Sequence, residues 1–447
     1  SVPTQIIIRT QRQFVRATRV RRRERHPDDA ADVPCRQPSL LVVVVAVQLP
    51  TLLLCLYNIL FNGAYTRNSF SLGADLGLAL ERLGEATTKC KSVILLRVLE
   101  QLIAKCVPDA SARELCEFGD KQILEETSKV FKKEKDSKKG IAFSTCVSVN
   151  NCICHFSPIP SETDYILKVG DFAKIDLGAH IDGFIAVVAH TVAVGATEVT
   201  GRGADVLLAA HYASEAALRL LRPSNENYAI TDVVQKITAE YGCKPVEGML
   251  SHQLKQFRID GEKSIIQNPS EAQRKEHEKA TLETYEVYAM DVLVSTGEGV
   301  GREMDTRCTI YKKTDEVYQL KLKASRMFYS EVRNKHGSMP FNLRSFDKET
   351  SARLGVVECV NHKLIEPFQV LYERPGELVA QFKFTALLLP SGTHRITGLP
   401  FDKSTCKSER TIKDPELNAL LNSSAKSNKK KKKKTGAEEP MEVETVA

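Results

Sequence analysis

The stretch DFAKIDLGAHIDGFIAVVAHT, residues 171–191, predicts an antiparallel β-hairpin with a carboxylate on its first strand. Its two halves are rich in apolar and β-branched residues, and Asp182-Gly183 between them is a dipeptide favoured in two-residue type I′ turns. The register that this turn imposes makes Val187 the diagonal neighbour of Asp176 on the same face. A second carboxylate there would converge with the first at a span suited to two metal ions roughly 3.5–4 Å apart. Because Val187 has no lone pair, the hairpin is either a metal site short of one ligand or a plain strand pair in which Asp176 is hydrogen-bonded.

The composition is that of a globular chain with a mild basic excess. Its 447 residues, 42% of them apolar, are enough for one large domain or two to three average ones, and the net charge is +7. The twelve cysteines contain no CxxC pair, which is typical of reduced thiols in the cytosol or nucleus. The sequence NCICH, residues 151–155, is the one cluster that resembles a metal site. Without a second cluster it favours structural thiols over a zinc site.

The first 88 residues differ from the rest of the chain. They contain no lysine and eleven arginines, crowded in RATRVRRRERH at 16–26, and the first methionine of the chain is Met249. We therefore interpret residues 1–88 as an unrelated leader, which belongs to a fragment or was produced by translation of non-coding sequence. An apolar run at 40–61 is long enough to span a bilayer. A real anchor would carry a lysine-tailed remainder with unpaired cysteines across the membrane, so we expect no membrane span in the mature protein.

From Lys89 onward, hydrophobic periodicity alternates between helical and strand patterns. Helices are predicted at 110–135, 200–222, 231–241, 322–335 and 347–362, strands at 145–157, 171–181, 184–193 and 285–299, and a last hairpin that includes 377–390. This mixture of hairpins and long helices is typical of an α+β fold with antiparallel sheet. The chain has no P-loop, no HExxH and no complete GxGxxG, which argues against a nucleotide-binding fold.

Seven motifs between Lys89 and Lys434 carry a family resemblance. They are VFKKEKDSKKGIAF, SVNNCICHFSP, KIDLGAHIDGFIA, EGMLSHQLKQFRIDGEKSIIQNP, VYAMDVLVSTGEG, MPFNLRSF and VAQFKFTALLLP. Together they resemble the proliferation-associated, growth-factor-receptor-binding homologues of type 2 methionine aminopeptidase. The resemblance implies the pita-bread fold of the creatinase and aminopeptidase superfamily, with residues 89–421 as one domain of two pseudo-symmetric α+β halves.

In aminopeptidases of this fold, two metal ions are held by two Asp on a hairpin, one His and two Glu. The resemblance places the first Asp at Asp176, the second at Val187 and the His at His252. It places the two Glu at Asp291, which is shorter by a methylene group, and at Lys383. An ammonium group where a dication needs an anion adds Coulomb repulsion to the lost ligand. The resemblance therefore implies that the chain binds no metal or other cofactor and is not a peptidase.

Two further positions match the aminopeptidase site. His155 matches the histidine that contacts the substrate near the reacting centre, and the other active-site histidine is replaced by Asp260. Without a metal-activated water, neither position has a nucleophile to serve. We expect the remaining ligand positions to form a leftover polar cluster in which Lys383 pairs with an Asp, and the alternative is a residual metal site.

Six consecutive lysines lie near the end of the chain and are followed by the acidic sequence EEPMEVE. Residues 422–447 cannot form a core and are predicted to be disordered. The lysine tract is either a solvated tail, or it binds phosphates and directs the chain to the nucleus and nucleolus. A weaker basic run at 132–139 either contributes to RNA binding or satisfies a helix end. The predicted RNA-binding lysines are Lys132, Lys133, Lys429, Lys430, Lys431, Lys432, Lys433 and Lys434.

The sequence DPELNALLNSS at 414–424 predicts a short helix with Asp414 as its N-cap and proline at its first position. This helix presents Leu417, Leu420 and Leu421 as an LxxLL face. Such a face docks into hydrophobic grooves of transcriptional partners. The alternative is that the three leucines pack on the chain's own domain.

If the scaffold is not a peptidase, its function must reside in its surfaces and tails. The resemblance implies a non-catalytic RNA-binding and ribosome-associated regulator of growth, acting in ribosome biogenesis with rRNA processing, translation control and transcriptional corepression. It implies rRNA, structured mRNA, ribosomal or pre-ribosomal particles, transcriptional corepressors and a receptor tyrosine kinase as partners, and cytoplasm, nucleus and nucleolus as locations. Two alternatives stay open. One is an active metal-dependent methionine aminopeptidase, and the other is a pure protein–protein adaptor that binds no RNA.

Overall fold

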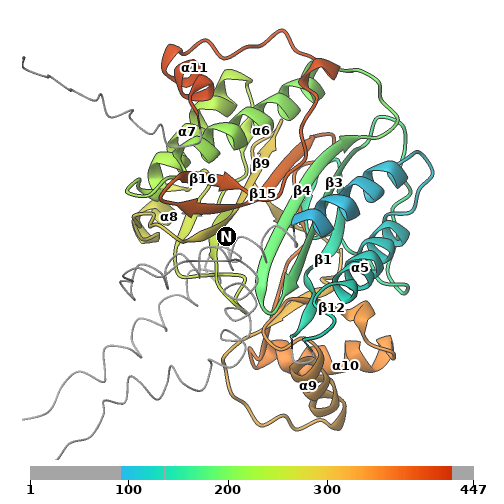
Figure 1. The fold of residues 1–447 in the computed structure, drawn as a ribbon. Helices are drawn as coiled ribbons and strands as arrows, with labels where there is room; N and C mark the ends of the chain where they lie inside the picture. Colours follow the sequence, from blue (N-terminus) through green and yellow to red (C-terminus); the bar gives the residue numbers. More distant parts are fainter. Residues whose placement is uncertain (1–91, 135–136, 425–447) are drawn as a thin grey trace, which may run out of the picture. The chain divides into compact units, whose positions relative to one another are not determined.

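The computed structural model describes residues 92–134 and 137–424 (Figure 1). The predicted leader with its apolar run at 40–61, the lysine tract at 429–434 and the acidic sequence after it lie outside the described residues. Within the described ranges, no helix is both long enough and apolar enough to cross a membrane.

A nine-stranded sheet forms the centre of the fold. Its strands follow the order β1-β3-β4-β15-β9-β7-β8, with β16 paired to β15 and β6 paired to β9. The pairings are antiparallel. Although β15 comes late in the chain, it lies between β4 and β9 and so joins the two halves of the sheet. The strands are β1 (Lys139–Val149), β3 (Phe172–Ile181), β4 (Phe184–Ala193), β6 (Lys244–Pro245), β7 (Leu250–Leu254), β8 (Ser264–Ile266), β9 (Val287–Ser295), β15 (Val379–Leu389) and β16 (Gly392–Arg395).

Helices cover the sheet in two groups (Figure 1). The helices α6 (Gly201–Leu220) and α7 (Asn227–Glu240) share an apolar core with β9 and β15. A helix at 92–105 and α5 (Ala112–Lys129) share a second apolar core with β1, β3 and β4. Each group fits its strands because its small and branched side chains face the sheet. The α+β class predicted from the sequence is confirmed.

Smaller elements surround the main sheet. Helices α9 (Lys323–Lys335) and α10 (Glu349–Asn361) enclose a third apolar core with a small sheet. The remaining elements are β2 (Cys152–Cys154), β5 (Val199–Thr200), α8 (Glu271–Glu276), β10 (Arg302–Glu303), β11 (Ile310–Lys313), β12 (Phe341–Asn342), η2 (Leu343–Ser345), β13 (Ile365–Pro367), β14 (Leu371–Tyr372), η3 (Lys403–Thr405), β17 (Cys406–Lys407) and α11 (Pro415–Asn422). Helix α11 includes Asn422, one residue beyond the domain end predicted at 421.

The hairpin predicted at 171–191 is confirmed in its strands, its turn and its register. β3 and β4 pair in antiparallel fashion, with Asp176 opposite Ala189. Asp182 and Gly183 have φ values of 52° and 76°, and a type I′ turn requires positive φ at both of these positions. The turn therefore places the hairpin residues on the faces that the sequence predicted.

The helix predicted at 110–135 is shorter in the structure, because the chain reverses after it. Helix α5 ends at Lys129, and Phe131 in the following turn has a φ of 46°. The Lys139 ammonium donates to the carbonyl oxygens of Val130 and Phe131, both at 2.7 Å. Lys139 of the basic run thus supplies hydrogen bonds to carbonyl oxygens at the end of the helix. For this lysine, the structure supports the helix-end alternative over a role in RNA binding.

Other predicted elements differ mainly at their ends. The strand predicted at 145–157 begins earlier, at Lys139, and is divided at Asn150, whose φ is 52°, into β1 and β2. The helix predicted at 231–241 starts earlier, at Asn227. The helices predicted at 200–222, 322–335 and 347–362 correspond to α6, α9 and α10. The last hairpin, which was predicted to include 377–390, corresponds to the pair of β15 with β16.

Candidate functional site

Lys383 lies between two buried carboxylates at the centre of the sheet. It is carried by β15, where it pairs with Ala189 of β4 on one side and with Asp291 of β9 on the other. Asp176 lies on β3, the next strand beyond β4. Lys383 Nζ is 2.9 Å from Asp291 Oδ2 and donates a hydrogen bond to Asp176 Oδ2. We call Asp176, Asp291 and Lys383 the buried triad.

One ammonium group is shared by two carboxylates in this triad, whose side chains are at most 10% exposed. Burial by itself disfavours the ammonium, but the two carboxylates reverse this effect and raise the pKa of Lys383 above its ordinary value. Burial raises the pKa of Asp176 to about 6, against the opposing pull of Lys383. Gln381 Nε2 donates to Asp291 Oδ1 at 2.8 Å and lies 3.4 Å from Asp176 Oδ2. The internal Asp partner that the sequence predicted for Lys383 is therefore present.

Val187 makes an apolar contact at the position predicted for the second Asp. It lies opposite Gly178, is 3% exposed, and belongs to an apolar cluster with Phe143 and Ile185. A Cβ atom added at Gly178 would lie 2.9 Å from Val187 Cγ1, so the valine already fills the space above that glycine. Thr385 Oγ1 accepts from the Val187 N–H at 2.8 Å and donates to the Val187 carbonyl at 2.9 Å. The sheet is packed here and offers no ligand.

The two histidines of the candidate site are held in different ways. His252 lies on β7 opposite Ala289, and burial together with the charge of Lys383 lowers its pKa. Its Nδ1 has no hydrogen-bond partner among the described residues. His155 has a φ of 66°, its Nδ1 lies 2.8 Å from the carbonyl oxygen of Gln369, and burial lowers its pKa to about 4. Both rings are therefore neutral near pH 7, and the Nδ1 of His155 is committed as a donor to the backbone.

Asp260 belongs to a surface ion-pair cluster. Its carboxylate pairs with Lys312, and its side chain is 51% exposed. The same lysine lies 3.7 Å from Glu366 on β13. The residue that replaces the second active-site histidine is therefore engaged with a surface lysine.

The Cys-x-Cys pair of NCICH forms β2, and both thiols are buried. Burial raises the pKa of Cys152 and of Cys154, which favours the protonated thiol over the thiolate that binds metals. The nine described cysteines are buried and form no disulfide. The pair thus serves the packing of β2, which pairs with β14, and Cys154 joins an apolar cluster with Leu293 and Val379.

The side chains present do not fit the two-metal centre of the aminopeptidases. In the part of the chain that the structure describes, no group of three or more His, Cys, Asp or Glu side chains is arranged to hold a metal ion. The Lys383 ammonium lies within hydrogen-bond distance of both Asp176 and Asp291, and it would repel a dication placed between them. Val187 supplies no ligand in place of the second Asp.

A buried histidine on β4 predicts acid sensitivity, and we expect His190→Phe to reduce it. His190 on β4 is 9% exposed and packs edge-on against Phe382, with ring centroids 5.2 Å apart. Burial lowers the pKa of His190 from 6.5 to about 4. Between these values the unfolded chain binds the additional proton, so stability is fully present above pH 6.5 and is lost as the pH falls towards 4. The substitution should recover up to about 3 kcal/mol at the acid end.

Urea unfolding of parent and His190→Phe at about pH 7.5 and about pH 4.5 measures this difference. The neutral-pH pair isolates the packing effect of the new ring, because the histidine is uncharged there in both folded and unfolded chains. Equal pH dependence in the two proteins would contradict the assignment.

The leucines of α11 pack on their own domain. Leu417 is 4% exposed within the core of α6 and α7, and Leu420 and Leu421 pack against the same core. A groove-binding partner would compete with the core for these side chains, and their role as a partner-docking face stays a prediction. Of the two alternatives raised by the LxxLL spacing, the structure supports packing in the domain.

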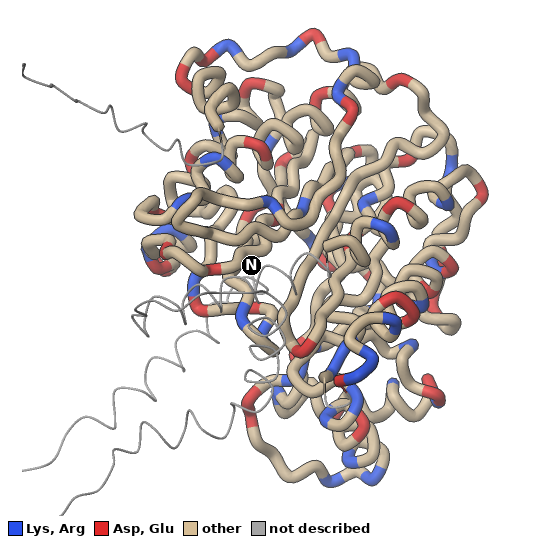
Figure 2. Tube along the Cα trace, viewed as in Figure 1, with Lys and Arg blue, Asp and Glu red and all other residues tan. Residues whose placement is uncertain are grey.

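Lys132 and Lys133 are exposed in the turn after α5. In the view of Figure 2, basic and acidic residues are interspersed over the described chain, and this turn is one of its basic segments. The structure does not bring these lysines to the buried triad. Their role in RNA binding, like that of the lysine tract outside the described residues, stays a prediction.

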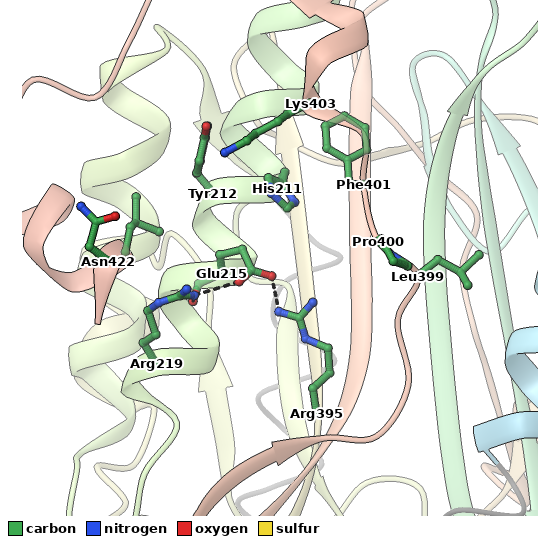
Figure 3. A pocket seen from close by; sticks show the side chains of 11 residues that line it. His211, Tyr212, Glu215, Arg219, Arg395, Leu399, Pro400, Phe401, Lys403 and Asn422 are labelled. Atoms are coloured by element: carbon green, nitrogen blue, oxygen red, sulfur yellow. Dashed lines mark hydrogen bonds and ion pairs between the residues drawn. The ribbon is translucent and has the colours of Figure 1, made fainter. Parts of the chain in front are cut away.

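A cavity of about 360 Å³ that the sequence did not indicate lies between α6, α11 and the segment around Phe401 (Figure 3). Basic and aromatic side chains line it together. These side chains come from α6 and from a segment about 180 positions later, so no local sequence motif predicts the cavity. The ones that matter for its chemistry are His211, Tyr212, Arg219, Arg395, Phe401 and Lys403.

Comparison with known proteins gives matches over most of the described chain. Residues 88–324 match the family model of metallopeptidase family M24. The chain is 46% identical over 355 residues to ERBB-3 binding protein 1 of Solanum tuberosum, which covers 78% of this chain and 90% of that protein. It is 44% identical over 335 residues to the curved DNA-binding protein of Schizosaccharomyces pombe, which covers 74% of this chain and 88% of that protein.

Among solved structures, a thermophilic Arx1 superimposes with a TM-score of 0.72 and 30% sequence identity, covering 76% of this chain and 98% of that one. The similarity confirms the pita-bread fold that the sequence motifs implied. The matches to binding proteins of the same superfamily also confirm the resemblance itself.

Proposed function

The chain belongs to metallopeptidase family M24, and within this family we propose that it is a non-catalytic RNA-binding and ribosome-associated regulator of growth. The observation that carries the proposal is the Lys383 ammonium held between Asp176 and Asp291. In the enzymes of this fold, metal ions generate the attacking hydroxide. An ammonium group in their place cannot do this, and Val187 leaves the hairpin without its second carboxylate.

Two observations support nucleic acid as the ligand. The sequence carries six consecutive lysines at 429–434, and lysines that neutralise phosphates release counterions and so favour binding. A relative that is 44% identical is named a curved DNA-binding protein. We propose rRNA, structured mRNA and ribosomal or pre-ribosomal particles as the partners of this chain.

The roles proposed with these partners are ribosome biogenesis including rRNA processing, translation control and transcriptional corepression, in cytoplasm, nucleus and nucleolus. They follow from the resemblance seen in the sequence. A relative named ERBB-3 binding protein 1 supports a receptor tyrosine kinase as a further partner. Crosslinking of the protein in cells, followed by mapping of the RNA and ribosomal contacts, tests these proposals, and enrichment of rRNA over other abundant RNA is the expected result.

The enzyme alternative makes a different prediction, and we expect it to fail. Titration of the purified protein with cobalt(II) or manganese(II) should show no stoichiometric pair of bound ions, and no methionine should be released from Met-initiated peptides. The reason is that one of the five ligand positions is apolar and one is cationic. Binding of two ions with turnover would disprove the non-catalytic assignment.

The matched variant for this titration is Val187→Asp with Lys383→Glu. It restores both missing carboxylates and should recover weak metal affinity. Full activity is not expected, because Asp291 is one methylene shorter than the Glu it replaces and groups that orient the ligands are needed for full metal affinity. A measurement of RNA affinity at several salt concentrations distinguishes the proposed function from the adaptor alternative, because a pure adaptor shows no salt-sensitive affinity for RNA.

A further inference from the structure

The cavity beside α6 has an aromatic end (Figure 3). His211 and Phe401 lie with ring centroids 5.1 Å apart, and Tyr212 stacks on Tyr241 at 6.1 Å with the planes 13° apart. Burial lowers the pKa of His211 to about 4, so its ring is neutral near pH 7. Lys403 Nζ lies 5.6 Å from the centroid of the Tyr212 ring. Flat, uncharged rings with a cation beside them are the surface on which nucleic-acid bases stack.

The other end of the cavity carries an excess of positive charge. Glu215 accepts a hydrogen bond from Arg219 Nη1 at 2.8 Å and another from Arg395, as Figure 3 shows. Two guanidinium groups thus share one carboxylate at this end, and Lys403 adds a further positive charge at the aromatic end. The shared carboxylate fixes the guanidinium planes, and a planar guanidinium with further N–H groups is suited to a phosphate.

From this arrangement we propose that the cavity binds one nucleotide of a single-stranded RNA. The base lies against Phe401 and Tyr212, its phosphate is held by Arg395 at the other end, and Lys403 beside Tyr212 holds the next phosphate of the strand. A nucleotide matches both ends, because it joins an aromatic ring to an anion within one unit. This inference rests on the proposed RNA-binding function and gives that function a site on the folded domain.

The covalent path to the lysine tract supports a strand of RNA over a free mononucleotide. Asn422 lines the cavity and is followed seven positions later by Lys429. Seven residues span at most roughly 25 Å even when fully extended. The tract and the cavity can therefore act on neighbouring phosphates of one strand, and linked sites of this kind bind more tightly than either site alone.

Fluorescence anisotropy with a labelled oligouridylate of about twelve nucleotides tests the proposal on the full chain. Phe401→Leu keeps an apolar side chain beside Phe382 but removes the ring, and it should weaken binding roughly tenfold with little change in salt dependence. Arg395→Gln with Lys403→Gln should weaken binding and flatten the log–log salt slope by about 1.4, the value for two phosphate contacts on a single strand.

The matched control is Lys236→Gln with Lys279→Gln, which removes the same charge from exposed positions that do not line the cavity. The cavity pair and the control pair are then measured again in a chain whose lysine tract is replaced by alanine. This separates the contribution of the cavity to RNA affinity from that of the tract. The unfolding curve of Phe401→Leu shows whether this variant folds. If it does not, the RNA affinity of Lys403→Gln alone tests the cavity, because the Lys403 side chain is exposed and its replacement leaves the core intact.

The outcomes distinguish failure of the cavity proposal from failure of the RNA-binding function. Cavity variants that bind RNA as tightly as the control pair overturn the cavity proposal and leave the RNA-binding function standing. A parent chain that does not bind the oligonucleotide overturns both. Uridine monophosphate is the probe for a free nucleotide as the ligand. If it competes at the same concentration as the unlabelled oligonucleotide, the cavity binds free nucleotides and the assignment to an RNA strand is overturned.

Discussion

Replacing Lys383 by methionine is expected to lower the free energy of unfolding by about 3–5 kcal/mol, the range measured when one partner of a buried ion pair is removed. Methionine has nearly the length of lysine, so the loss of packing is small. Asp176 and Asp291 would be left as two carboxylates on adjacent parts of one sheet, each at most 10% exposed and without a cation. Denaturant unfolding at pH 7 measures the effect.

Two controls separate charge from shape in this experiment. Lys383→Met combined with Asp176→Asn and Asp291→Asn removes all three charges and should recover most of the lost stability, since a neutral cluster of similar volume often replaces a buried ion pair without loss. If the triple variant is no more stable than the single one, packing of the lysine stem explains the loss, and the electrostatic account fails.

The pH dependence of the single variant gives a second check. Without the ammonium, burial raises the pKa of Asp176 further above the unfolded value of 3.8. A carboxyl whose pKa is raised on folding contributes stability below its unfolded pKa, and this contribution is lost as the pH rises through the folded pKa. The gap between parent and Lys383→Met should therefore narrow as the pH falls from the raised pKa of the variant to about 6, the pKa of Asp176 in the parent. A gap that is constant with pH would contradict an uncompensated carboxylate.

Replacing all six lysines at 429–434 by alanine should weaken RNA binding at low salt by a large factor and flatten the log–log salt slope by up to about 4. Each phosphate neutralised on a single strand adds about 0.7 to the magnitude of that slope, and six lysines reach several phosphates at once. Titration of a single-stranded oligonucleotide at several salt concentrations measures both the affinity and the slope.

An arginine tract at 429–434 is the matched control, because it keeps the charge and changes only the cationic group. It should retain the parent slope. Equal slopes for the parent and the alanine variant would show that the tract acts as an address signal or as a solvated tail, and that RNA contact belongs to the folded domain.

The hairpin and its missing ligand could be derived from the sequence, because local chemistry decides them. Asp182-Gly183 selects the turn, the turn sets the register, and the register assigns Asp176 and Val187 to one face. The partner of Lys383 could be anticipated as well, since a buried ammonium requires a carboxylate. Which carboxylates it meets depends on the placement of β15 between β4 and β9, and strand order is a long-range property that periodicity does not contain.

The cavity and the leucine helix show what the sequence could not decide. Tyr212 and Phe401 line one cavity only after the sheet and its helices are assembled, so no local sequence motif predicts that they act together. The spacing of Leu417, Leu420 and Leu421 is the same for a helix that docks on a partner and for one that packs on its own core. Only the position of α11 against α6 separates the two cases.

The place of β15 in the sheet also bears on how the chain folds while it is being made. Synthesis of the β3–β4 hairpin is complete roughly 10–40 s before Val379 is added, at typical rates of synthesis. Until then β4 is an edge strand with unpaired backbone groups, which invites pairing with other chains. A nascent chain that stops before Val379 therefore has an open sheet edge near an unneutralised Asp176, and completion of the native sheet is coupled to the arrival of that single strand.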